Sequence, residues 1–418
     1  MSPIRVVVVD DSVVVRRLVA DALAGDPEIV VVGTAANGQI ALAKIEQLAP
    51  DLVTMDVEMP VMNGIEAVRA LRRRGDTYPI VMFSTVTERG ASATFDALAA
   101  GATDYVTKPA NVGSVAESLL RVAEQLVPLI KALVPRPASG ATSPRSLAVP
   151  SPATRPITPP PARTGWGTSA TARPDAPRST PQFADPHHTD PHLASPQRSG
   201  APSSRLILLA SAPSGPPRPV RAVLIGSSTG GPVALSRVLS AISTPLPVPV
   251  VIVQHMPPVF TQQLAARLDR VGASTVIESV GDEELEPGYV YIAPGDHHLE
   301  LRGSPRGGRT SLSQGPPVNF CRPSVDVMFR SAVRVFGGDL LAVVLTGMGS
   351  DGRNGCEDIV AAGGSVLVQD EASSVVWGMP GAVATAGLAH RVLPLEQIGA
   401  ALVGSLRESA LDTTGGTR

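Results

Sequence analysis

The sequence predicts an α/β protein with two doubly wound domains, an N-terminal (βα)5 domain with a parallel sheet and a C-terminal domain with a mostly parallel sheet. Short apolar runs alternate with helix-patterned segments over residues 4–133 and again over 220–406. A proline-rich stretch separates the two series, and 418 residues leave room for two or three domains. We therefore expect domains at 1–133 and 220–407, a disordered linker at 134–219 and a disordered tail at 408–418.

Five β/α repeats make up the first domain. Its strands are expected at residues 4–9, 29–33, 51–56, 80–84 and 103–107. Its helices are expected at 12–24, 38–48, 63–73, 88–100 and 112–132. Gly25, Gly75 and Gly101 follow expected helix ends, where a glycine commonly terminates a helix. Five such repeats in about 130 residues predict a parallel sheet covered by helices.

The composition changes abruptly between residues 135 and 219. This stretch of 85 residues holds 20 of the 41 prolines, and its nine arginines and three aspartates give a formal charge of +6. Such a segment cannot bury enough apolar surface to offset its ordering entropy, so we expect a disordered linker. Its three histidines are interpreted as incidental rather than as a metal site: His187, His188 and His192.

A second α/β series begins near residue 220. Its strands are expected at 220–226, 248–254, 289–293, 339–345 and 365–369. Its helices are expected at 231–241, 259–270, 323–336, 352–362 and 394–406. Between them, the stretch around 289–314 resembles a hairpin, with a turn offered by Gly307–Gly308.

The composition excludes several protein classes. A formal net charge of −2, with no lysine at all after Lys131, gives no sign of nucleic-acid binding. No apolar run approaches the roughly 18 residues of a membrane span, and the first run is too short for a signal peptide. The two cysteines, Cys321 and Cys356, suggest no disulfide framework. We expect a soluble cytoplasmic protein without membrane insertion.

Polar residues end four strands of the first domain. They are Asp10, Asp11, Asp56, Ser84 and Lys108. Because the carboxyl ends of parallel strands share one edge, we expect these side chains to converge there. Three clustered carboxylates favour a hard cation such as Mg²⁺, beside which an aspartate can accept a phosphoryl group. A helix cap alone would explain the first two aspartates but not Asp56 or Lys108.

Three strand ends of the second domain present a serine, a histidine and an aspartate. The first strand leads into Ser227-Ser228, the next ends at His255, and a later one leads to Asp351. These are the residue types of a Ser-His-Asp hydrolase, which is defined by geometry rather than by chain order. The residues alone do not choose between the two serines. The loop Gly347-Met348-Gly349 could add a backbone donor for an oxyanion.

These residues have other interpretations. Gly226-x-x-x-Gly230-Gly231 could bind a dinucleotide, but the next strand end offers His255 instead of the acid that a ribose needs. Asp351 could cap the helix that begins near Gly352, and this role is compatible with catalysis. His297 and His298 are interpreted as surface or substrate-rim residues.

Long motifs in both domains resemble known families. Four motifs are similar to those of response-regulator receiver domains: Val8–Ser12, Met55–Pro60, Phe83–Thr85 and Val106–Pro109. Five resemble the chemotaxis protein-glutamate methylesterases of the CheB family: Ile225–Gly231, Gln254–Pro258, Tyr291–Asp296, Arg322–Asp326 and Leu345–Gly352. Together the two resemblances cover nearly everything outside the linker.

The second resemblance implies an enzyme that hydrolyses glutamyl methyl esters of chemoreceptors, releases methanol and also deamidates receptor glutamines. It implies Ser228 as the nucleophile, because the catalytic serine of the family precedes Thr-Gly-Gly. It implies His255 as the general base and acid, and Asp351 as the orienting carboxylate. Thr229 and Met348 lie in the two loops expected around the oxyanion. No cofactor is expected in this catalytic site.

The first resemblance implies that Asp56 takes a phosphoryl group from a chemotaxis histidine kinase. It implies that Mg²⁺ is held by Asp11, Asp56 and the backbone carbonyl of Glu58, with assistance from Asp10. Ser84 and Tyr105 would couple phosphorylation to surface rearrangement, and Lys108 would contact the phosphoryl oxygens. In the family the receiver restrains the catalytic domain until it is phosphorylated. Because a short connection is general in the family, the long linker predicts weaker restraint here.

Overall fold

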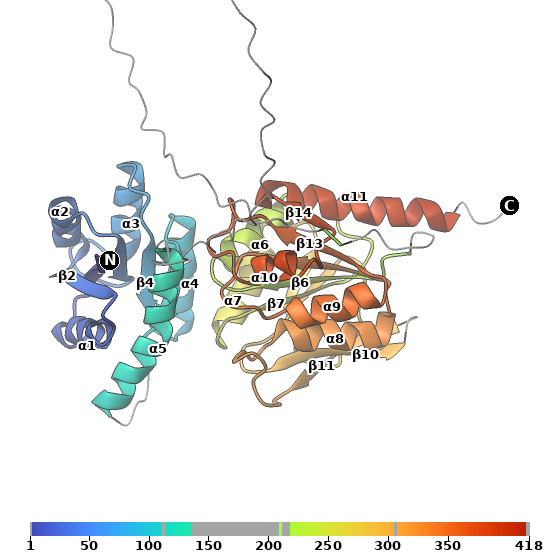
Figure 1. Ribbon diagram of the computed structural model, residues 1–418, viewed down its shortest axis with the longest axis horizontal. Helices are drawn as coiled ribbons and strands as arrows, with labels where there is room; N and C mark the ends of the chain where they lie inside the picture. Colours follow the sequence, from blue (N-terminus) through green and yellow to red (C-terminus); the bar gives the residue numbers. More distant parts are fainter. Residues whose placement is uncertain (1, 110–113, 136–208, 211–217, 305–306, 415–418) are drawn as a thin grey trace, which may run out of the picture. The chain divides into compact units, whose positions relative to one another are not determined.

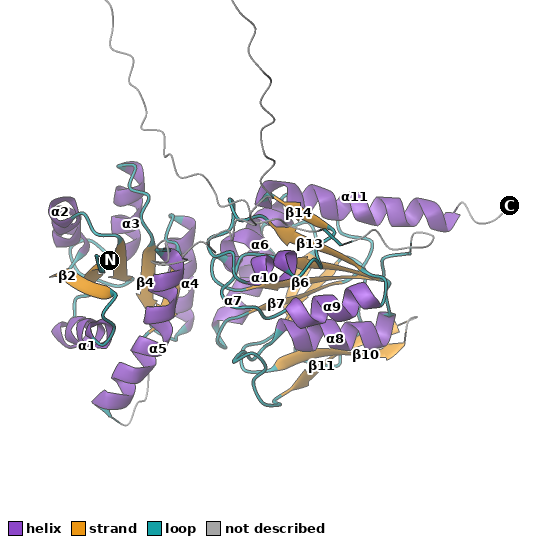
Figure 2. Ribbon diagram, viewed as in Figure 1, coloured by secondary structure: helices purple, strands orange, loops and turns teal. Residues whose placement is uncertain are grey.

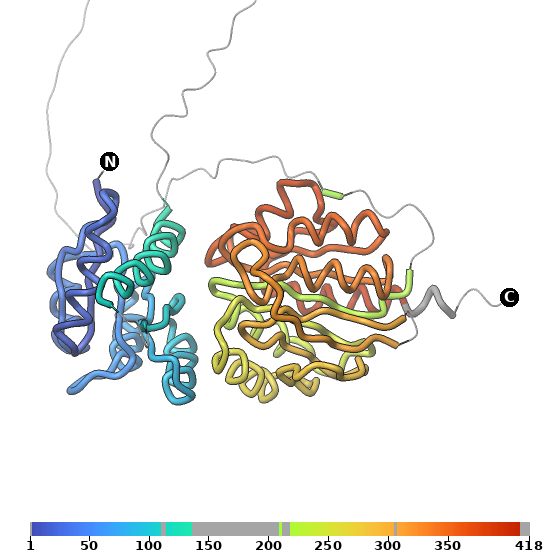
Figure 3. The backbone as a smooth tube through the Cα atoms, turned by 90° about the horizontal axis from the view of Figure 1, so that it is seen from below, coloured from blue at the N-terminus to red at the C-terminus, as the bar shows by residue number. Residues whose placement is uncertain are grey.

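The computed structural model describes residues 2–109, 114–135, 209–210, 218–304 and 307–414 (Figure 1). Most of the predicted linker, including its three histidines, lies outside the described residues. The same is true of residues 415–418 of the predicted tail. Figure 3 follows the chain by colour through each domain. Among the described residues, no helix combines the length and the apolar character needed to cross a membrane.

The N-terminal domain contains one parallel five-stranded sheet in the order β2-β1-β3-β4-β5. Its strands are β1 (Ile4–Val9), β2 (Ile29–Ala35), β3 (Leu52–Asp56), β4 (Ile80–Ser84) and β5 (Asp104–Thr107). Its helices are α1 (Val13–Ala24), α2 (Gly38–Leu48), α3 (Gly64–Arg73), α4 (Glu88–Ala99) and α5 (Val115–Leu133). The predicted fold class of this domain is confirmed.

Helices cover both faces of this sheet, which explains why its strands are apolar throughout. Val6, Val8 and Val81 pack on one face against side chains of α1 and α5. Alternate residues such as Val7, Val53 and Met82 are equally buried on the face that packs against α2, α3 and α4. The layers are visible in Figure 2.

The C-terminal domain is built on a seven-stranded parallel sheet in the order β14-β13-β12-β6-β7-β9-β8. Its strands are β6 (Ala222–Ser227), β7 (Val250–Gln254), β8 (Thr275–Glu278), β9 (Tyr289–Ile292), β12 (Leu340–Val344), β13 (Ser365–Gln369) and β14 (Arg391–Leu393). Its helices are α6 (Gly231–Ser240), α7 (Phe260–Leu268), α8 (Val325–Phe336), α9 (Arg353–Ala361), α10 (Met379–Thr385) and α11 (Leu395–Thr414).

Two layers of helices enclose this second sheet (Figure 2). Leu224, Val251 and Val344 point toward α8, α9 and α10 in one apolar cluster. Their strand neighbours Ile225 and Ile252 point the other way, toward α6, α7 and α11. An antiparallel hairpin of β10 (His298–Ser304) and β11 (Gly307–Ser313) stands apart from the sheet.

Several predicted details need correction. Gly307 and Gly308 lie in strand β11, where they pair with Ser304 and Gly303, and do not form the predicted turn. Helix α11 continues to Thr414, beyond the predicted domain end at residue 407. Gly75 and Gly101 have the left-handed φ of helix-ending glycines, +90° and +111°, but Gly25 does not, at −68°. The elements β8, β14 and α10 were not predicted.

Candidate functional site

The N-terminal sheet brings its strand-end residues together as expected. Asp10 follows β1 directly, and Asp56 is the last residue of β3. Both residues are almost fully buried, with exposed fractions of 1% and 4%. Lys108 follows β5, and its Nζ lies 2.8 Å from Oδ2 of each aspartate. The backbone N–H of Lys108 also donates to the Ser84 carbonyl at 2.6 Å, which fixes the lysine at this edge.

Burial governs the electrostatics of Asp56. Loss of solvent raises the pKa of its carboxyl to about 6, and repulsion from Asp10 adds to the rise, although Lys108 opposes it. The Lys108 ammonium is held charged, since its two carboxylate partners outweigh burial and raise its pKa. The cluster thus concentrates negative charge that one lysine only partly offsets.

This cluster fits a hard cation. Asp10, Asp11 and Asp56 each offer a carboxylate oxygen, and these oxygens lie within 4.8 Å of one another. Asp10 Oδ2 is buried and has no hydrogen-bond partner among the described residues, and it forms an ion pair with Lys108 Nζ at 2.8 Å. Oxygen-only donors are what Mg²⁺ prefers. Glu58 lies two residues after Asp56 with its exposed side chain 3.2 Å from Arg89.

The two residues expected to transmit phosphorylation lie on neighbouring strands. Ser84 is 1% exposed, and its hydroxyl receives a hydrogen bond from Thr94 of α4 at 2.7 Å. It also donates to the carbonyl of Gly90, in the first turn of α4, at 3.2 Å. Tyr105, on β5, pairs in register with Met82 of β4. The Ser84 hydroxyl is therefore tied to helix α4.

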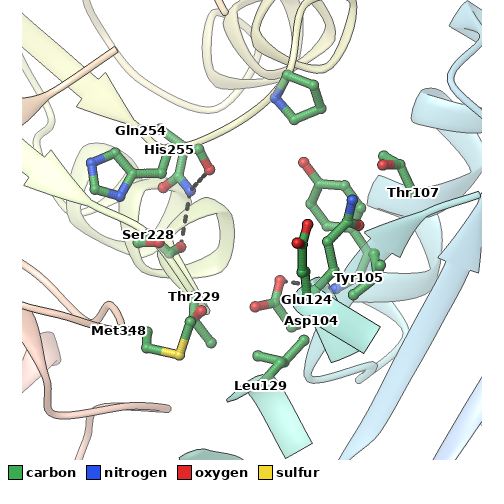
Figure 4. A pocket seen from close by; sticks show the side chains of 13 residues that line it. Asp104, Tyr105, Thr107, Glu124, Leu129, Ser228, Thr229, Gln254, His255 and Met348 are labelled. Carbon is green, nitrogen blue, oxygen red and sulfur yellow. Dashed lines mark hydrogen bonds between the residues drawn. The ribbon is translucent and has the colours of Figure 1, made fainter. Parts of the chain in front are cut away.

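In the C-terminal domain, the loop after β6 separates its two serines clearly. Ser227 is fully buried, and its hydroxyl donates to Gln254 Oε1 at 2.7 Å. Ser228 is partly exposed, and its backbone carbonyl accepts a hydrogen bond from Gln254 Nε2 at 2.9 Å (Figure 4). Gln254, which sequence reasoning gave no role, therefore holds this loop. A Cβ at Gly231 would lie 1.9 Å from Gln254 Oε1, so the helix start must be glycine.

His255 and Asp351 form the expected pair. His255 Nε2 lies 2.8 Å from Asp351 Oδ2, so in the neutral ring Nε2 carries the proton and Nδ1 is the base atom. The backbone N–H of His255 donates to the Ser227 carbonyl at 3.0 Å, which sets the two loops side by side (Figure 4). Among the hydrogen bonds of the described residues, none joins His255 to the Ser228 side chain.

Asp351 is held by the N-terminus of α8 rather than by its own helix. Its Oδ2 accepts from the Val325 N–H at 2.6 Å, and its Oδ1 accepts from Ser324 Oγ at 2.9 Å. Helix α9 begins at Arg353, and its N-cap residue is Gly352, with no side-chain cap from Asp351. The alternative that Asp351 caps α9 is therefore wrong, and the positive end of α8 stabilises its charge.

A second aspartate, Asp326, binds the start of α9 in the way that Asp351 binds the start of α8, and the sequence did not predict this role. Asp326, in the first turn of α8, accepts from the N–H groups of Gly352 and Gly355 at 3.0 and 2.7 Å. Asn319 Nδ2 joins the two carboxylates, at 2.8 Å from Asp351 and 2.9 Å from Asp326. The two helix starts thus hold each other and the carboxylate that orients His255.

Cys321 was also missed as a neighbour of His255. Its Sγ lies 3.6 Å from His255 Nδ1, and it is partly exposed. A tight turn positions it, since Val318 and Cys321 exchange backbone hydrogen bonds of 3.1 and 2.9 Å. No sequence motif signals this contact, because it joins residues far apart in the chain.

The charges of the pair are strongly coupled. Burial lowers the pKa of His255, but the hydrogen bond to Asp351 and the contact with Cys321 outweigh it and raise that pKa to about 9. Burial raises the pKa of Asp351, but hydrogen bonds from His255, Asn319 and Val325 hold it at about 2. Asp351 is therefore a carboxylate at neutral pH, and it stabilises protonated His255.

The remaining predicted residues differ in exposure and in hydrogen bonding. Met348 is 38% exposed, while Thr229 is 7% exposed with its carbonyl bonded to Thr346 Oγ1 at 2.9 Å. The Gly347 N–H is already donated to the Val376 carbonyl, so it is not an available oxyanion donor. The surface interpretation of His298 is wrong: it is 3% exposed and accepts the Ser324 N–H at 3.2 Å.

Both domains match known protein families. The CheB methylesterase family profile matches residues 223–402, and the response regulator receiver domain profile matches residues 6–119. A protein-glutamate methylesterase/protein-glutamine glutaminase of Nocardioides sp. is 53% identical over 399 residues, covering 96% of this chain and 94% of its own. That of Trichodesmium erythraeum is 41% identical, covering 95% of this chain and 97% of its own.

The solved catalytic domain of the Thermotoga maritima CheB methylesterase is 42% identical to this chain. The structural match covers 44% of this chain and 97% of the Thermotoga maritima domain, with a TM-score of 0.43. The two full-length relatives align over nearly their whole length and nearly all of this sequence. A chain of this length, long linker included, is therefore no departure from those relatives.

Proposed function

The chain belongs to the CheB methylesterase family, and from that premise we propose that it hydrolyses methyl esters of glutamate side chains in chemoreceptors, releasing methanol. The observation that supports this most is the convergence of Ser228, His255 and Asp351 at the carboxyl ends of parallel strands. A partly exposed serine beside an oriented imidazole is the arrangement of a serine hydrolase.

In this mechanism Ser228 Oγ attacks the ester carbonyl carbon while His255 Nδ1 takes the hydroxyl proton. The C–O bond to the methoxy group then breaks, and His255 returns the proton so that methanol leaves. Water attacks the acyl-serine by the same route and restores the carboxylate. Ser228 must turn toward Nδ1 for the attack, and such bonds commonly tighten only when substrate is bound.

Asp351 contributes by orientation and charge. Its hydrogen bond to Nε2 fixes the tautomer that leaves Nδ1 free, and its carboxylate stabilises the imidazolium formed during attack. Backbone N–H groups near Thr229 and Met348 are the proposed oxyanion donors. The same site would deamidate glutamine, with ammonia leaving in place of methanol.

The receiver domain is the proposed switch. Asp56 accepts a phosphoryl group from a chemotaxis histidine kinase, and Lys108 pairs with the phosphoryl oxygens. Mg²⁺ would be held by Asp10, Asp11, Asp56 and the Glu58 carbonyl, and when bound it neutralises phosphoryl charge. The link from Ser84 to α4 would carry the change to the domain surface, with Tyr105 on the next strand.

The proposed setting is the cytoplasm, where thiols stay reduced. Two free cysteines, Cys321 and Cys356, agree with that setting.

Methanol release from a methylated chemoreceptor fragment tests the esterase. We expect Ser228→Ala to lower kcat by at least about a thousandfold, as removal of a triad nucleophile does. Ser227→Ala, which alters a buried neighbour, should keep most of the activity. Retained activity in Ser228→Ala would refute the proposed nucleophile. Ammonia release from the unmodified glutamine form, measured on the same variants, tests the deamidase.

A further inference from the structure

Cys321 has no part in the proposed chemistry, yet it lies against the base atom of His255. Its Sγ is 3.6 Å from Nδ1, on the side of the ring opposite Asp351. The thiol is partly exposed, and the turn from Val318 to Cys321 holds its backbone in place. His255, Cys321 and Asp351 form one of two clusters of metal-binding side chains among the described residues.

The separation of sulfur and nitrogen is that of two ligands on one zinc ion. Zinc binds cysteine sulfur at about 2.3 Å and histidine nitrogen at about 2.05 Å in tetrahedral geometry. Those lengths and a tetrahedral angle put sulfur and nitrogen about 3.6 Å apart. The observed separation of 3.6 Å matches this distance.

Asp351 occupies the place of an outer-shell carboxylate. Histidines that bind metals usually donate their other ring N–H to a carboxylate, which fixes the ring and raises its basicity. Here Nε2 donates to Asp351 at 2.8 Å, and both Asp351 oxygens are held further by the start of α8. Nδ1 and the thiol are then left as the two protein ligands.

The donor types separate this cluster from the one in the receiver. Asp10, Asp11 and Asp56 offer only oxygen, which suits Mg²⁺, whereas nitrogen and sulfur favour Zn²⁺. The two ions should therefore bind to different domains.

We propose that His255 and Cys321 form a zinc-binding site, oriented by Asp351, through which Zn²⁺ reversibly inhibits the esterase. Binding releases the thiol proton and, from protonated His255, the Nδ1 proton to solvent, and it forms Zn–S and Zn–N bonds with no change of oxidation state. The Nδ1 lone pair that would accept the Ser228 proton is then occupied. The inhibitory part of this inference rests on the proposed function, because it needs His255 to act as the base.

The first test titrates buffered Zn²⁺ against methanol release by the full chain, with each variant compared with its own metal-free rate. Wild type should be inhibited and should recover with a chelator, while Cys321→Ser should need at least about tenfold more zinc. Cys356→Ser is the matched control, since this second thiol is fully buried in the core and should not alter the zinc response. Equal zinc sensitivity of wild type and Cys321→Ser would overturn the inference.

The second test observes metal binding without activity. Co²⁺ added to the full chain carrying Ser228→Ala should give a thiolate-to-cobalt charge-transfer absorption that Cys321→Ser abolishes. Replacing His187, His188 and His192 together should leave that absorption unchanged, which separates this site from linker histidines. Absence of the absorption overturns the site. If this absorption appears but the wild-type chain releases no methanol from the receptor fragment, the site stands and the proposed function is refuted instead.

Discussion

At the scale of single residues, the coupling of His255 to Asp351 sets the acid–base behaviour of the candidate site. Asp351 stays charged to about pH 2, and His255 is held protonated well above the usual range of an imidazole. A base with this environment is strong but is mostly protonated near neutral pH. The histidine charge also adds to folding stability below pH 6.5, and this contribution is lost as pH rises through about 9.

The first prediction concerns the pH profile of the esterase. Because only neutral His255 can accept the Ser228 proton, kcat/KM should rise with pH. The midpoint of this rise, the acid limb of the profile, should lie above pH 6.5 and close to the His255 pKa of about 9. Cys321→Ser removes one of the contacts that raise the pKa and should move this limb to lower pH. Cys356→Ser should leave it in place. A wild-type limb at or below pH 6.5 would contradict the coupling seen here.

Residues at strand ends could be predicted from the sequence, while their supporting partners could not. His255 and Asp351 follow parallel strands, and the topology alone sends both to one sheet edge. Asn319 and Cys321 reach the same place from a turn after the hairpin, across 32 and 66 residues of chain. Such long-range contacts depend on packing and leave no periodic signal.

At the scale of elements, helices α8 and α9 start against each other and exchange acidic caps. Asp351 caps α8 from the loop before α9, and Asp326 caps α9 from the first turn of α8. The exchange places the orienting carboxylate by helix geometry rather than by a flexible loop. A change in one helix start should therefore affect both stability and the position of Asp351.

The second prediction follows from this exchange. Asp326→Ala leaves the buried backbone N–H groups of Gly352 and Gly355, at the start of α9, without this acceptor, at a cost of about 2 kcal/mol. For a domain of this size, Tm should fall by roughly 4–8 °C, measured by calorimetry. Asp358→Ala, which breaks only an exposed pair with Arg330, should change Tm by roughly 2 °C or less. Equal effects of the two variants would show that the cap contributes little.

The third prediction concerns the turn that carries Asn319 and Cys321. Its central residues, Asn319 and Phe320, have φ of +53° and +63°, and Phe320 is fully exposed. A phenylalanine in left-handed backbone costs about 1–2 kcal/mol, and the full exposure of this ring shows no packing against the described residues that would offset the cost. Phe320→Gly should raise stability by about 0.5–1 kcal/mol, after allowance for the more flexible unfolded chain.

Thermal unfolding of Phe320→Gly should show this gain as a Tm raised by a few degrees. Val280→Gly is its control, since Val280 is 82% exposed but is not among the residues with left-handed backbone. That control should lose stability or stay unchanged. A lower Tm in Phe320→Gly would show that the aromatic ring has a stabilising role that outweighs its strained backbone.

Element prediction failed where strands or helices are short or irregular. β14 has only three residues, and β8 is a four-residue edge strand with one exposed end. α10 begins Met379-Pro380-Gly381, two helix-unfavourable residues that the sequence presents as a loop. The long apolar strands and amphipathic helices were predictable because burial on both sheet faces requires them.

At the scale of the whole molecule, the sequence joins a phosphorylation switch to a hydrolase through about 85 residues rich in proline and arginine. The composition of this segment predicts a flexible coil, for which a length of 85 residues gives an r.m.s. span of roughly 50 Å. The concentration at which a tethered domain meets its partner falls as about the −3/2 power of tether length. In the proposed function, the tether therefore limits how strongly the unphosphorylated receiver restrains the catalytic domain.

The fourth prediction uses tether length as the variable. Shortening the 85-residue segment to about 20 residues should raise the effective concentration of the receiver roughly ninefold, from (85/20) to the power 3/2. Basal methanol release should then fall by up to that factor. The rate with acetyl phosphate and Mg²⁺ should stay close to that of the original chain. Asp56→Asn in the shortened chain should keep the low basal rate and lose the response to phosphodonor.

A scrambled linker of the original length and composition is the matched control, and it should behave like the original chain. Because scrambling keeps the +6 charge and the proline content, it separates tether length from any sequence-specific role of the segment. An unchanged basal rate in the shortened chain would mean that restraint does not depend on tether concentration. In that case the domain association would have to be strong enough to saturate even across the long linker, and isolated receiver added in trans should then inhibit as well.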